Sequence, residues 1–401
     1  MLVAPTGSGK TLAYLLAALP FINRERPDEV QVLVVSPTRE LALQIEATVK
    51  KMAVGLKSVV CYGGHAMQVE KRNFSPTPTI VIGTPGRLVD HLHRDHFKLK
   101  QNAVLILDEF DKALEMGFHD DMEFILEQNH PQANIWLCSA TESLDLPSFV
   151  EPQSFSRLIK ESEVQSRLRF LRVYGIRGKR ERLYSLLHQI PAEATVVFCN
   201  QKDTVNVLVS DMRQRGIDAI AFHGGMEQHR REVSLAKFRN GSATVLVSTD
   251  LAARGIDVDE LNHVVHYDLP EKEATFTHRN GRTARIARKG TVYMVQNETE
   301  IEEFSELDYE DFELQNGAQR RAKPKWQTFF ISGGKKNKIN KIDLVGFFIQ
   351  VGRLEKSEIG LIEVKDFASF VAIKSDRAKQ VLALCRYEKI KKKKLRIEIA
   401  R

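Results

Sequence analysis

Short apolar runs alternate with amphipathic stretches along most of the chain, and this alternation limits it to few folds. The first runs are QVLVVSP, KSVVCYG, TIVIGTP, AVLILDE and NIWLCSA, each rich in branched aliphatic residues and ending in small or turn residues. Helical patterns such as RELALQIEATVKKMA lie between several of them. Strands that are apolar throughout and separated by helices are typical of a parallel sheet covered on both faces. Such sheets bind ligands at the carboxyl ends of their strands.

The alternation restarts after about residue 155, with the runs RFLRVYGI, ATVVFCN, IDAIAFHGG, ATVLVSTD, HVVHYDL and TVYMVQN. A chain of 401 residues is too long for one compact core. Residues from about 300 to 326, first acidic and then basic, read as a solvated helix end and a linker. We therefore predict a first lobe over 1–154, a second over 155–312, a linker over 313–326 and a last domain over 327–401.

The last domain has its own pattern and its own charge. TFFISGG, GLIEVKD, FASFVAIK and KKKLRIEIA read as strands, with helices at KIDLVGFFIQV and SDRAKQVLALCRY. This βαββαβ order is the layout of an RNA-recognition-type domain. Residues 327–401 hold 18 Lys and Arg against 8 Asp and Glu, a net +10, whereas the preceding residues hold 41 against 44, a net −3. A basic module on a near-neutral body indicates a polyanionic partner, most simply a nucleic acid.

A phosphate-binding loop stands at the start of the chain. APTGSGKT fits the Walker A pattern, except that Ala4 stands where the first glycine is usual. Small residues let backbone N–H groups approach phosphate oxygens, and the helix from about Lys10 directs its positive end at the same anion. Lys10 would pair with the β and γ phosphates, and Thr11 would hold Mg²⁺. The residues expected to bind ATP here are Ala4, Pro5, Thr6, Gly7, Ser8, Gly9, Lys10 and Thr11.

A second element of the same chemistry follows the run AVLIL. Asp108 and Glu109 end a buried strand, where a Walker B element belongs. Asp108 would hold Mg²⁺, and Glu109 would orient or deprotonate the attacking water. A strand followed by an acidic helix cap is an equally good interpretation of this segment alone. The presence of the phosphate-binding loop in the same chain favours the interpretation as a Walker B element.

These elements and a series of further motifs resemble the DEAD-box RNA helicase family, from Met1 to about Gln296. Phe110 stands where the family has Ala, which predicts local repacking. The remaining motifs occur in the family's order: Pro37-Thr38-Arg39-Glu40-Leu41-Ala42, Gly63-Gly64, Thr84-Pro85-Gly86-Arg87, Asp108-Glu109-Phe110-Asp111, Ser139-Ala140-Thr141, Phe198-Cys199-Asn200, His223-Gly224, Gln228 with Arg231, Ser248-Thr249-Asp250, Ala253-Arg254-Gly255-Ile256-Asp257 and His278-Arg279-Asn280-Gly281-Arg282-Thr283-Ala284-Arg285.

The resemblance implies two RecA-like lobes that hydrolyse ATP with Mg²⁺ and locally unwind RNA duplexes. It implies Lys10, Asp108, Glu109, Arg282 and Arg285 as catalytic residues, the two arginines acting on the γ-phosphate from the second lobe. Asp257 would bind the ribose. The residues implied to couple the lobes are Asp111, Ser139, Thr141, His278 and Arg279. Those implied to hold the RNA backbone are Thr38, Arg39, Gly64, Thr84, Arg87, Gln228, Arg231 and Thr249.

The last domain, from Thr328 to Arg401, resembles the C-terminal RNA-binding domain of the DbpA branch of this family. That resemblance implies a hairpin of large-subunit ribosomal RNA and pre-ribosomal particles as partners. Alternation in TFFIS puts Phe330 opposite Phe329 and Ile331, either to stack on a base or to be buried under a neighbouring helix or loop. Lysines are the other RNA-binding candidates, unless they form only a solvated or edge-protecting feature: Lys335, Lys336, Lys338, Lys341 and Lys391 to Lys394.

The beginning of the chain departs from the family pattern. Only Met1-Leu2-Val3 precedes the phosphate-binding loop, and nothing corresponds to the upstream aromatic and glutamine with which the family recognises adenine. The chain therefore reads as an N-terminally shortened helicase, with a catalytically idle RNA-binding protein as the alternative. No apolar stretch near the start is long enough for a membrane span, and the four cysteines have no metal-binding spacing. We expect a cytoplasmic monomer with reduced, buried thiols and no membrane partner.

Overall fold

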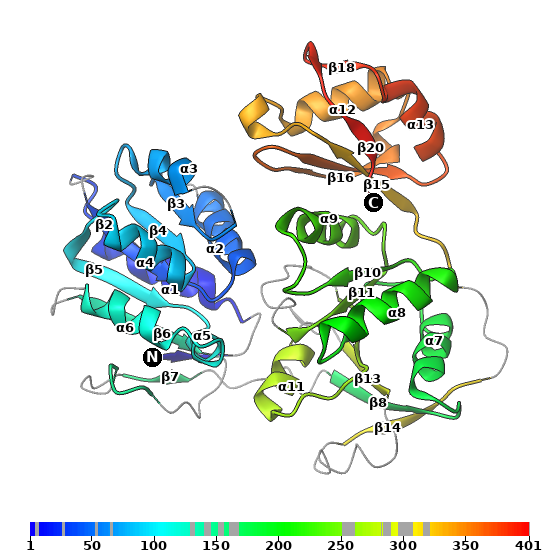
Figure 1. Ribbon diagram of the computed structural model, residues 1–401, viewed down its shortest axis with the longest axis horizontal. Helices are drawn as coiled ribbons and strands as arrows, with labels where there is room; N and C mark the ends of the chain where they lie inside the picture. Colours follow the sequence, from blue (N-terminus) through cyan, green and yellow to red (C-terminus); the bar gives the residue numbers. More distant parts are fainter. Residues whose placement is uncertain are drawn as a thin grey trace. The chain divides into compact units, whose positions relative to one another are not determined.

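The structure is a computed structural model, which describes the chain except for residues 5–7, 26–28, 53–54, 65–66, 129–132, 140–145, 151–155, 160–167, 251–260, 282, 284–289, 296–307, 316–320 and 401. The described residues form two compact units. The first contains the first lobe, and the second contains both the second lobe and the C-terminal domain (Figure 1). Among the described helices, none combines the length and the apolar character needed to cross a bilayer.

The first unit is built on a seven-stranded parallel sheet in the order β3-β4-β2-β5-β6-β1-β7. Its strands are β1 (Leu2–Val3), β2 (Val30–Val35), β3 (Ser58–Cys61), β4 (Ile80–Gly83), β5 (Leu99–Leu107), β6 (Asn134–Ser139) and β7 (Leu158–Ile159). Its helices are α1 (Lys10–Ala18), α2 (Arg39–Lys51), α3 (Met67–Lys71), α4 (Pro85–His93), α5 (Phe110–Glu115) and α6 (His119–Glu127), with short 3₁₀ turns at Leu19–Phe21 and Arg72–Phe74.

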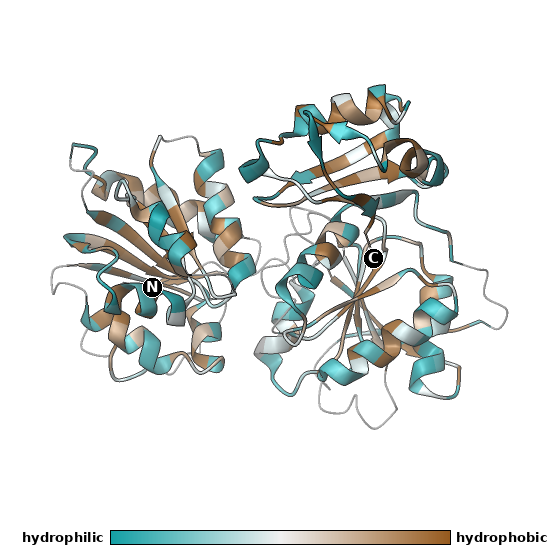
Figure 2. Ribbon diagram, turned by 45° about the horizontal axis from the view of Figure 1, so that its top comes forward, coloured by the Kyte–Doolittle hydropathy of each residue, from teal (hydrophilic) through white to brown (hydrophobic). Residues whose placement is uncertain are grey.

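The five apolar runs of the first lobe are strands β2 to β6, as predicted, and β2 shows why they are mostly apolar. Every residue of β2 is buried. Leu33 and Val35 pack into the core on one face of the sheet, and Val32 and Val34 into the core on the other. Figure 2 shows apolar residues concentrated on the strands, whereas the helices carry both apolar and polar residues. The replaced alanine position, Phe110, is fully buried in the first of these cores.

The predicted end of the first lobe at residue 154 is too early. β7 pairs in parallel with β1, with Leu158 opposite Leu2 and Ile159 opposite Val3. The sequence gives little sign of this strand because it has two residues and lies at the sheet edge, where Leu158 is 70% exposed.

The second unit begins with another seven-stranded parallel sheet, in the order β10-β11-β9-β12-β13-β8-β14. Its strands are β8 (Leu168–Tyr174), β9 (Thr195–Phe198), β10 (Ala219–Phe222), β11 (Val245–Ser248), β12 (His263–His266), β13 (Gly290–Val295) and β14 (Glu310–Glu313). Its described helices are α7 (Lys179–Gln189), α8 (Lys202–Gln214), α9 (Gln228–Arg239) and α11 (Glu273–Asn280).

Two parts of the predicted acidic helix end and linker are ordered on the second lobe. β14 pairs with β8, and Arg172 binds Asp311 with 2.6 Å between Nε and Oδ1. Arg321 is buried, and its Nη1 donates to the carbonyl of Leu187 at 2.5 Å. The segment that joins the second lobe to the C-terminal domain is therefore shorter than the predicted 313–326.

The C-terminal domain has the predicted βαββαβ layout, with an antiparallel sheet in the order β16-β17-β15-β20. An unpredicted hairpin, β18–β19, stands between the last helix and the last strand. The elements are β15 (Trp326–Ile331), the 3₁₀ turn η6 (Lys335–Asn337), α12 (Lys341–Gln350), the 3₁₀ turn η7 (Lys356–Glu358), β16 (Ile359–Val364), β17 (Ser369–Lys374), α13 (Ala378–Cys385), β18 (Lys389–Ile390), β19 (Lys393–Lys394) and β20 (Ile397–Ile399).

Candidate functional site

The phosphate-binding loop lies between the end of β1 and the start of α1. Gly9 has a φ of 89°, in the left-handed region where a side chain would be strained, and α1 begins at Lys10. The Lys10 ammonium donates to the carbonyl of Ala4, whose own N–H donates to the carbonyl of Ser139 at 3.1 Å. The loop is thus anchored to β6. Three of its predicted ATP-binding residues, Pro5, Thr6 and Gly7, lie outside the described residues.

Asp108 lies at the carboxyl end of β5 and is only 4% exposed. Its Oδ2 accepts a hydrogen bond from the Tyr14 hydroxyl of α1 at 2.9 Å, and its Oδ1 accepts one from the Glu109 N–H at 3.0 Å. Burial, and then the negative charge of Glu109, raise the pKa of Asp108 to about 6. Burial also raises the pKa of Asp111. Removing these carboxylates from water without enough positive charge is costly.

This carboxylate cluster fits a bound cation and a triphosphate. In the described part of the chain, the buried Ser8 Oγ and Glu109 Oε2 have no hydrogen-bond partner. A cation next to Asp108 would favour its ionised form, and Ser8 would gain a partner from a phosphate oxygen. The structure therefore brings Lys10 and Tyr14 of α1 close to the carboxylates that follow β5.

Three residues predicted to hold the RNA backbone lie together on the first unit. Thr38 is the N-cap of α2, where its hydroxyl accepts from the Leu41 N–H at 3.3 Å. The guanidinium of Arg39 lies against the Gly63-Gly64 turn after β3. Gly64 has a φ of 105°, where a side chain would be strained, and a Cβ there would lie 2.6 Å from Arg39 Nη1 and displace the guanidinium.

Arg87, a fourth predicted RNA-binding residue, is held by a buried network that the sequence analysis missed. Glu70 of α3 is 1% exposed, and its Oε2 accepts from Arg87 Nε and His91 Nε2, both at 2.7 Å. Its Oε1 accepts from the Tyr62 N–H at 3.0 Å. Burial alone would raise the pKa of Glu70, but the hydrogen bonds from His91, Tyr62 and Arg87 hold it below its ordinary value. Glu70 thus joins the turn after β3 to α4, whose N-cap is the predicted Thr84.

Cys61, Glu70 and His91 lie close enough to suggest a metal site. However, the Glu70 oxygen that would bind a metal already accepts two hydrogen bonds, one of them from a guanidinium. Burial also raises the pKa of the Cys61 thiol well above its usual range, which opposes the thiolate that binds metals. We interpret the cluster as a hydrogen-bond network.

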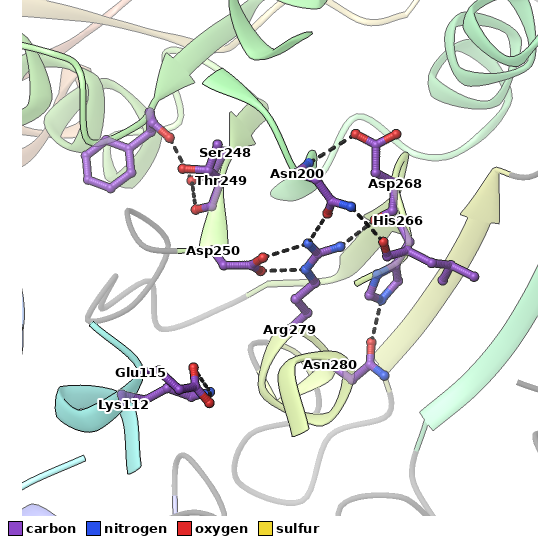
Figure 3. Close-up of polar contacts among 12 residues, drawn as sticks. Lys112, Glu115, Asn200, Ser248, Thr249, Asp250, His266, Asp268, Arg279 and Asn280 are labelled. Atoms are coloured by element: carbon purple, nitrogen blue, oxygen red, sulfur yellow. Dashed lines mark hydrogen bonds and ion pairs between the residues drawn. The ribbon is translucent and has the colours of Figure 1, made fainter. Parts of the chain in front are cut away.

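In the second unit, Arg279 of α11 joins the carboxyl ends of three strands (Figure 3). It is 2% exposed, and its Nε and Nη2 bind the two carboxylate oxygens of Asp250 at 2.5 and 2.7 Å. Its Nη2 also donates to Asn200 Oδ1 at 2.7 Å, and its Nη1 donates to the Asp268 carbonyl. The sequence analysis gave Arg279 a role between the lobes. Within its own unit the guanidinium is buried and fully engaged in these contacts, and the role between the lobes stays a prediction.

The other predicted residues of the second lobe that the structure describes lie in three segments. Gln228 and Arg231 lie in the first turn of α9, where Arg231 lies over the ring of Phe222, and Thr249 follows β11. His278 is half-buried near the end of α11. Thr141, Asp257, Arg282 and Arg285 lie outside the described residues.

Phe330 is not available to stack on a base in this structure. It lies on the opposite sheet face from Phe329 and Ile331, as predicted, but it is 6% exposed and packs with Val233 and Ala236 of α9. Polar contacts surround this apolar contact: Ser242 and Thr328 hydroxyls lie 2.6 Å apart, and Arg239 and Glu363 are 3.5 Å apart. The second of the two alternatives for Phe330, burial under a neighbouring helix, is the one observed.

The lysines predicted to bind RNA come together on the C-terminal domain. Lys335, Lys336 and Lys338 are exposed in and after η6. The β18–β19 hairpin packs against this turn, since Lys391 Nζ donates to the Lys338 carbonyl at 3.1 Å and Lys393 Nζ donates to the Asn337 carbonyl. Lys391 also binds Asp343 of α12, the helix that begins at the predicted Lys341. The lysines of the η6 segment and those of the β18–β19 hairpin, far apart in the sequence, thus form one basic surface.

Family models match all three parts of the chain: residues 1–146 match the DEAD/DEAH box helicase, 178–287 the helicase conserved C-terminal domain and 328–399 the DbpA RNA binding domain. An ATP-dependent RNA helicase DbpA from Bacillus subtilis is 28% identical over 98% of this chain and 90% of its own length. The ATP-dependent RNA helicase FAL1 from Candida albicans is 33% identical over 76% of this chain and 78% of its own. In fold, the chain is similar to S. cerevisiae Dbp5 bound to RNA and ADP BeF3, with a TM-score of 0.67 and 24% identity over 79% of this chain and 85% of that one.

Asp108→Asn should stabilise the first unit while abolishing ATP hydrolysis. Because the pKa of Asp108 rises from 3.8 to about 6 on folding, ionisation destabilises the folded chain above pH 3.8, increasingly up to about pH 6. Removing the charge should therefore raise the free energy of unfolding by about 1 to 3 kcal/mol at pH 7.5. Urea unfolding in a Trp326→Phe background, with Trp136 as reporter, measures this. The gain in the free energy of unfolding should vanish near pH 4. An equal gain at pH 4 and pH 7.5 would contradict a raised pKa of Asp108 in the folded chain.

Glu70→Gln should weaken the response to RNA without slowing the chemistry. If Glu70 orients Arg87 through Nε, its loss should raise the RNA concentration for half-maximal ATP hydrolysis about tenfold, within the range of one charged hydrogen bond. The maximal rate should stay nearly unchanged. Arg87→Lys, which keeps the charge but loses Nε, should do the same, and the double variant should be no worse than either.

Glu46→Gln is the matched control, because Glu46 pairs with Lys50 on α2. A Glu70→Gln variant that lowers the maximal rate and leaves the RNA requirement unchanged would show that Glu70 supports only the fold.

Proposed function

Because the chain belongs to the DEAD-box family of ATP-dependent RNA helicases, in its DbpA branch, we propose that it remodels large-subunit ribosomal RNA during ribosome assembly. The observation that carries the proposal is the basic surface of the C-terminal domain, which joins the η6 turn to the β18–β19 hairpin. This domain would bind a ribosomal RNA hairpin and bring the two lobes to a neighbouring duplex. We propose further that the chain acts as a monomer in the cytoplasm, on pre-ribosomal particles.

ATP turnover would use the residues gathered at the ends of β1 and β5. Lys10 would bind the phosphates, and Glu109 would orient the attacking water. Thr11 and Asp108 would hold Mg²⁺, which supplies positive charge at the transferring phosphoryl group. The raised pKa of Asp108 fits this assignment, since burial and the charge of Glu109 outweigh the positive charge of Lys10 nearby. Arg282 and Arg285 keep the catalytic role that the family resemblance gives them.

RNA would contact the lobes and the C-terminal domain in different ways. Backbone-directed groups such as Thr38, Arg39 and Arg87 position a strand without reading its sequence. Choice of the RNA would then depend on the C-terminal domain. The lobes alone would act on short duplexes of any sequence, and the added domain would raise their local concentration next to its hairpin.

ATP hydrolysis by this chain tests the proposal. It should be measured without RNA, with an unrelated RNA, and with a large-subunit ribosomal RNA hairpin that carries a flanking duplex. We expect turnover to be stimulated chiefly by the ribosomal fragment and to be lost in Lys10→Ala. Equal stimulation by the unrelated RNA would contradict the ribosomal target. Tight RNA binding without turnover would instead support a catalytically idle RNA-binding protein.

Lys392→Gly should stabilise the hairpin and weaken RNA binding. Lys391 and Lys392 form the two-residue loop of β18–β19 with φ values of 50° and 65°, where Asn-Gly is the favoured sequence. A glycine there should remove about 1 kcal/mol of backbone strain. If Lys392 contacts a phosphate, the slope of log affinity against log salt should fall by about 0.7 to 0.9.

Affinity for the ribosomal RNA hairpin at several salt concentrations gives the slope. Hydrogen exchange of the backbone amides in the β18–β19 hairpin reports its stabilisation. Lys392→Arg keeps the charge and should keep the slope. Unchanged salt dependence in Lys392→Gly would show that Lys392 does not contact an RNA phosphate.

A further inference from the structure

Phe367 is the exposed phenylalanine of the C-terminal domain, and no motif of the sequence analysis includes it. It lies in the turn between β16 and β17 and is 65% exposed. The other phenylalanines of the domain are all at least 93% buried: Phe329, Phe330, Phe347, Phe348 and Phe370. An aromatic ring left in water forgoes a large part of the free energy that its burial would give. Phe367 is therefore a candidate contact residue for a ligand of this domain.

The turn that carries Phe367 is held firmly by the segment around η6. The N–H groups of Lys335 and Lys336 donate to the carbonyls of Lys365 and Asp366 at 2.8 and 2.9 Å. Within the turn, the Lys365 N–H donates to the Ala368 carbonyl at 2.8 Å. These bonds fix the backbone on both sides of Phe367.

Glycines permit this close approach. A Cβ on Gly334 would lie 2.1 Å from the Lys365 carbonyl oxygen, so no other residue fits there. The Ser369 hydroxyl donates to the Gly333 carbonyl at 2.6 Å, which ties the start of β17 to the same segment. Phe367 is thus presented on a rigid support, which lowers the entropic cost of binding.

The support is also basic. Lys335 and Lys336, whose backbones hold the turn, have exposed side chains. The β18–β19 hairpin adds Lys391 and Lys393, which are bonded to the carbonyls that follow in the same segment. An exposed aromatic ring among lysines is the combination that binds single-stranded nucleic acid, because the ring stacks on a base and the lysines neutralise phosphates.

The usual base-stacking surface of such domains is occupied in this chain. Phe330 and Phe370 lie on the sheet face that packs against α9, together with Ala400. Arg396 lies over the Phe330 ring, and His229 of α9 meets its edge. A base would therefore have to stack elsewhere, and the β16–β17 turn offers an aromatic ring beside the lysines.

We propose that Phe367 stacks on an unpaired base of the RNA whose phosphates are held by the lysines of the η6 segment and the β18–β19 hairpin. This inference rests on the RNA-binding role proposed for the domain and adds a subsite to it. Stacking accepts every base, so the subsite would select unpaired nucleotides over paired ones rather than a particular sequence. A hairpin loop or a bulge offers such nucleotides, and a blunt duplex does not.

Phe367→Ala in the full chain should weaken binding of a ribosomal RNA hairpin with an unpaired loop about tenfold, or about 1.4 kcal/mol. It should leave binding of a blunt duplex of equal length, and the salt dependence of both, unchanged. Phe367→Tyr and Phe367→Trp should retain affinity because they keep an aromatic ring. Phe367→Leu keeps an apolar side chain and should bind as weakly as the alanine variant.

Phe367→Trp also gives a direct signal, since stacking on a base should quench its fluorescence when the hairpin is added. The parent chain, with only Trp136 and Trp326, gives the background. Leu361→Ala, which alters an exposed apolar residue of the same domain on β16, is the matched control and should bind normally.

Normal binding by Phe367→Leu, or equal loss of hairpin and duplex binding in Phe367→Ala, would overturn the stacking proposal. Lys335→Gln and Lys336→Gln separate this failure from failure of the proposed function. In one outcome, the lysine variants weaken RNA binding and flatten its salt dependence while Phe367→Ala does not. That result would support the RNA-binding surface and contradict the Phe367 subsite. If none of these variants changes RNA binding, the RNA-binding role of this surface falls as well.

Discussion

A parallel sheet covered by helices on both faces can carry polar groups only at the ends of its strands, and this constraint places the functional groups of both lobes. In the first lobe, β2 is buried throughout and apolar except for Gln31 near its start, the last residues of β5 are apolar and buried, and Asp108 comes directly after β5. In the second lobe, Asn200, Asp250 and Asp268 follow β9, β11 and β12 in the same way. The polar functional groups of each lobe therefore lie at the carboxyl end of its sheet.

The polar groups at the carboxyl ends of the two sheets differ in how fully they are paired. In the second lobe, Asp250 is matched by the buried guanidinium of Arg279, whose other nitrogens also have partners, and the arrangement acts as a joint between three strand ends. In the first lobe, Asp108 and Glu109 have no guanidinium among the described residues to balance them, and a buried oxygen of Glu109 has no partner there. A saturated network fixes structure, whereas an unsatisfied one stores a preference for a ligand. These incompletely paired acidic groups therefore lie at the carboxyl end of the first sheet, next to the helix that follows the phosphate-binding loop.

The parts of the fold that could be predicted from sequence are those in which burial dictates residue type. Strands β2 to β6 of the first lobe, and most strands of the second, are mostly apolar runs that no exposed segment would carry. β7, β14 and the β18–β19 hairpin were missed because they are short and exposed, and Glu310 or Lys393 in a strand gives no periodic signal. The Walker-type residues were predicted because their chemistry requires those residue types. Glu70 was missed, because a buried glutamate is recognisable only from its partners, and these come from separate turns and helices.

The C-terminal domain shows how a small domain can serve two partners. Its sheet face is apolar at Phe330 and Phe370 and packs on α9, the helix whose first turn carries Gln228 and Arg231. Its lysines and Phe367 stay exposed on turns, although Lys391 and Lys392 strain the backbone and the Phe367 ring forgoes burial. Features that cost stability and persist on a rigid support point to binding rather than to folding. Because the sheet face is used within the chain, RNA captured on the turns would be held at a fixed place relative to α9. The domain would then act as an arm that sets where the second lobe meets the RNA, and not only as a tether that raises its local concentration.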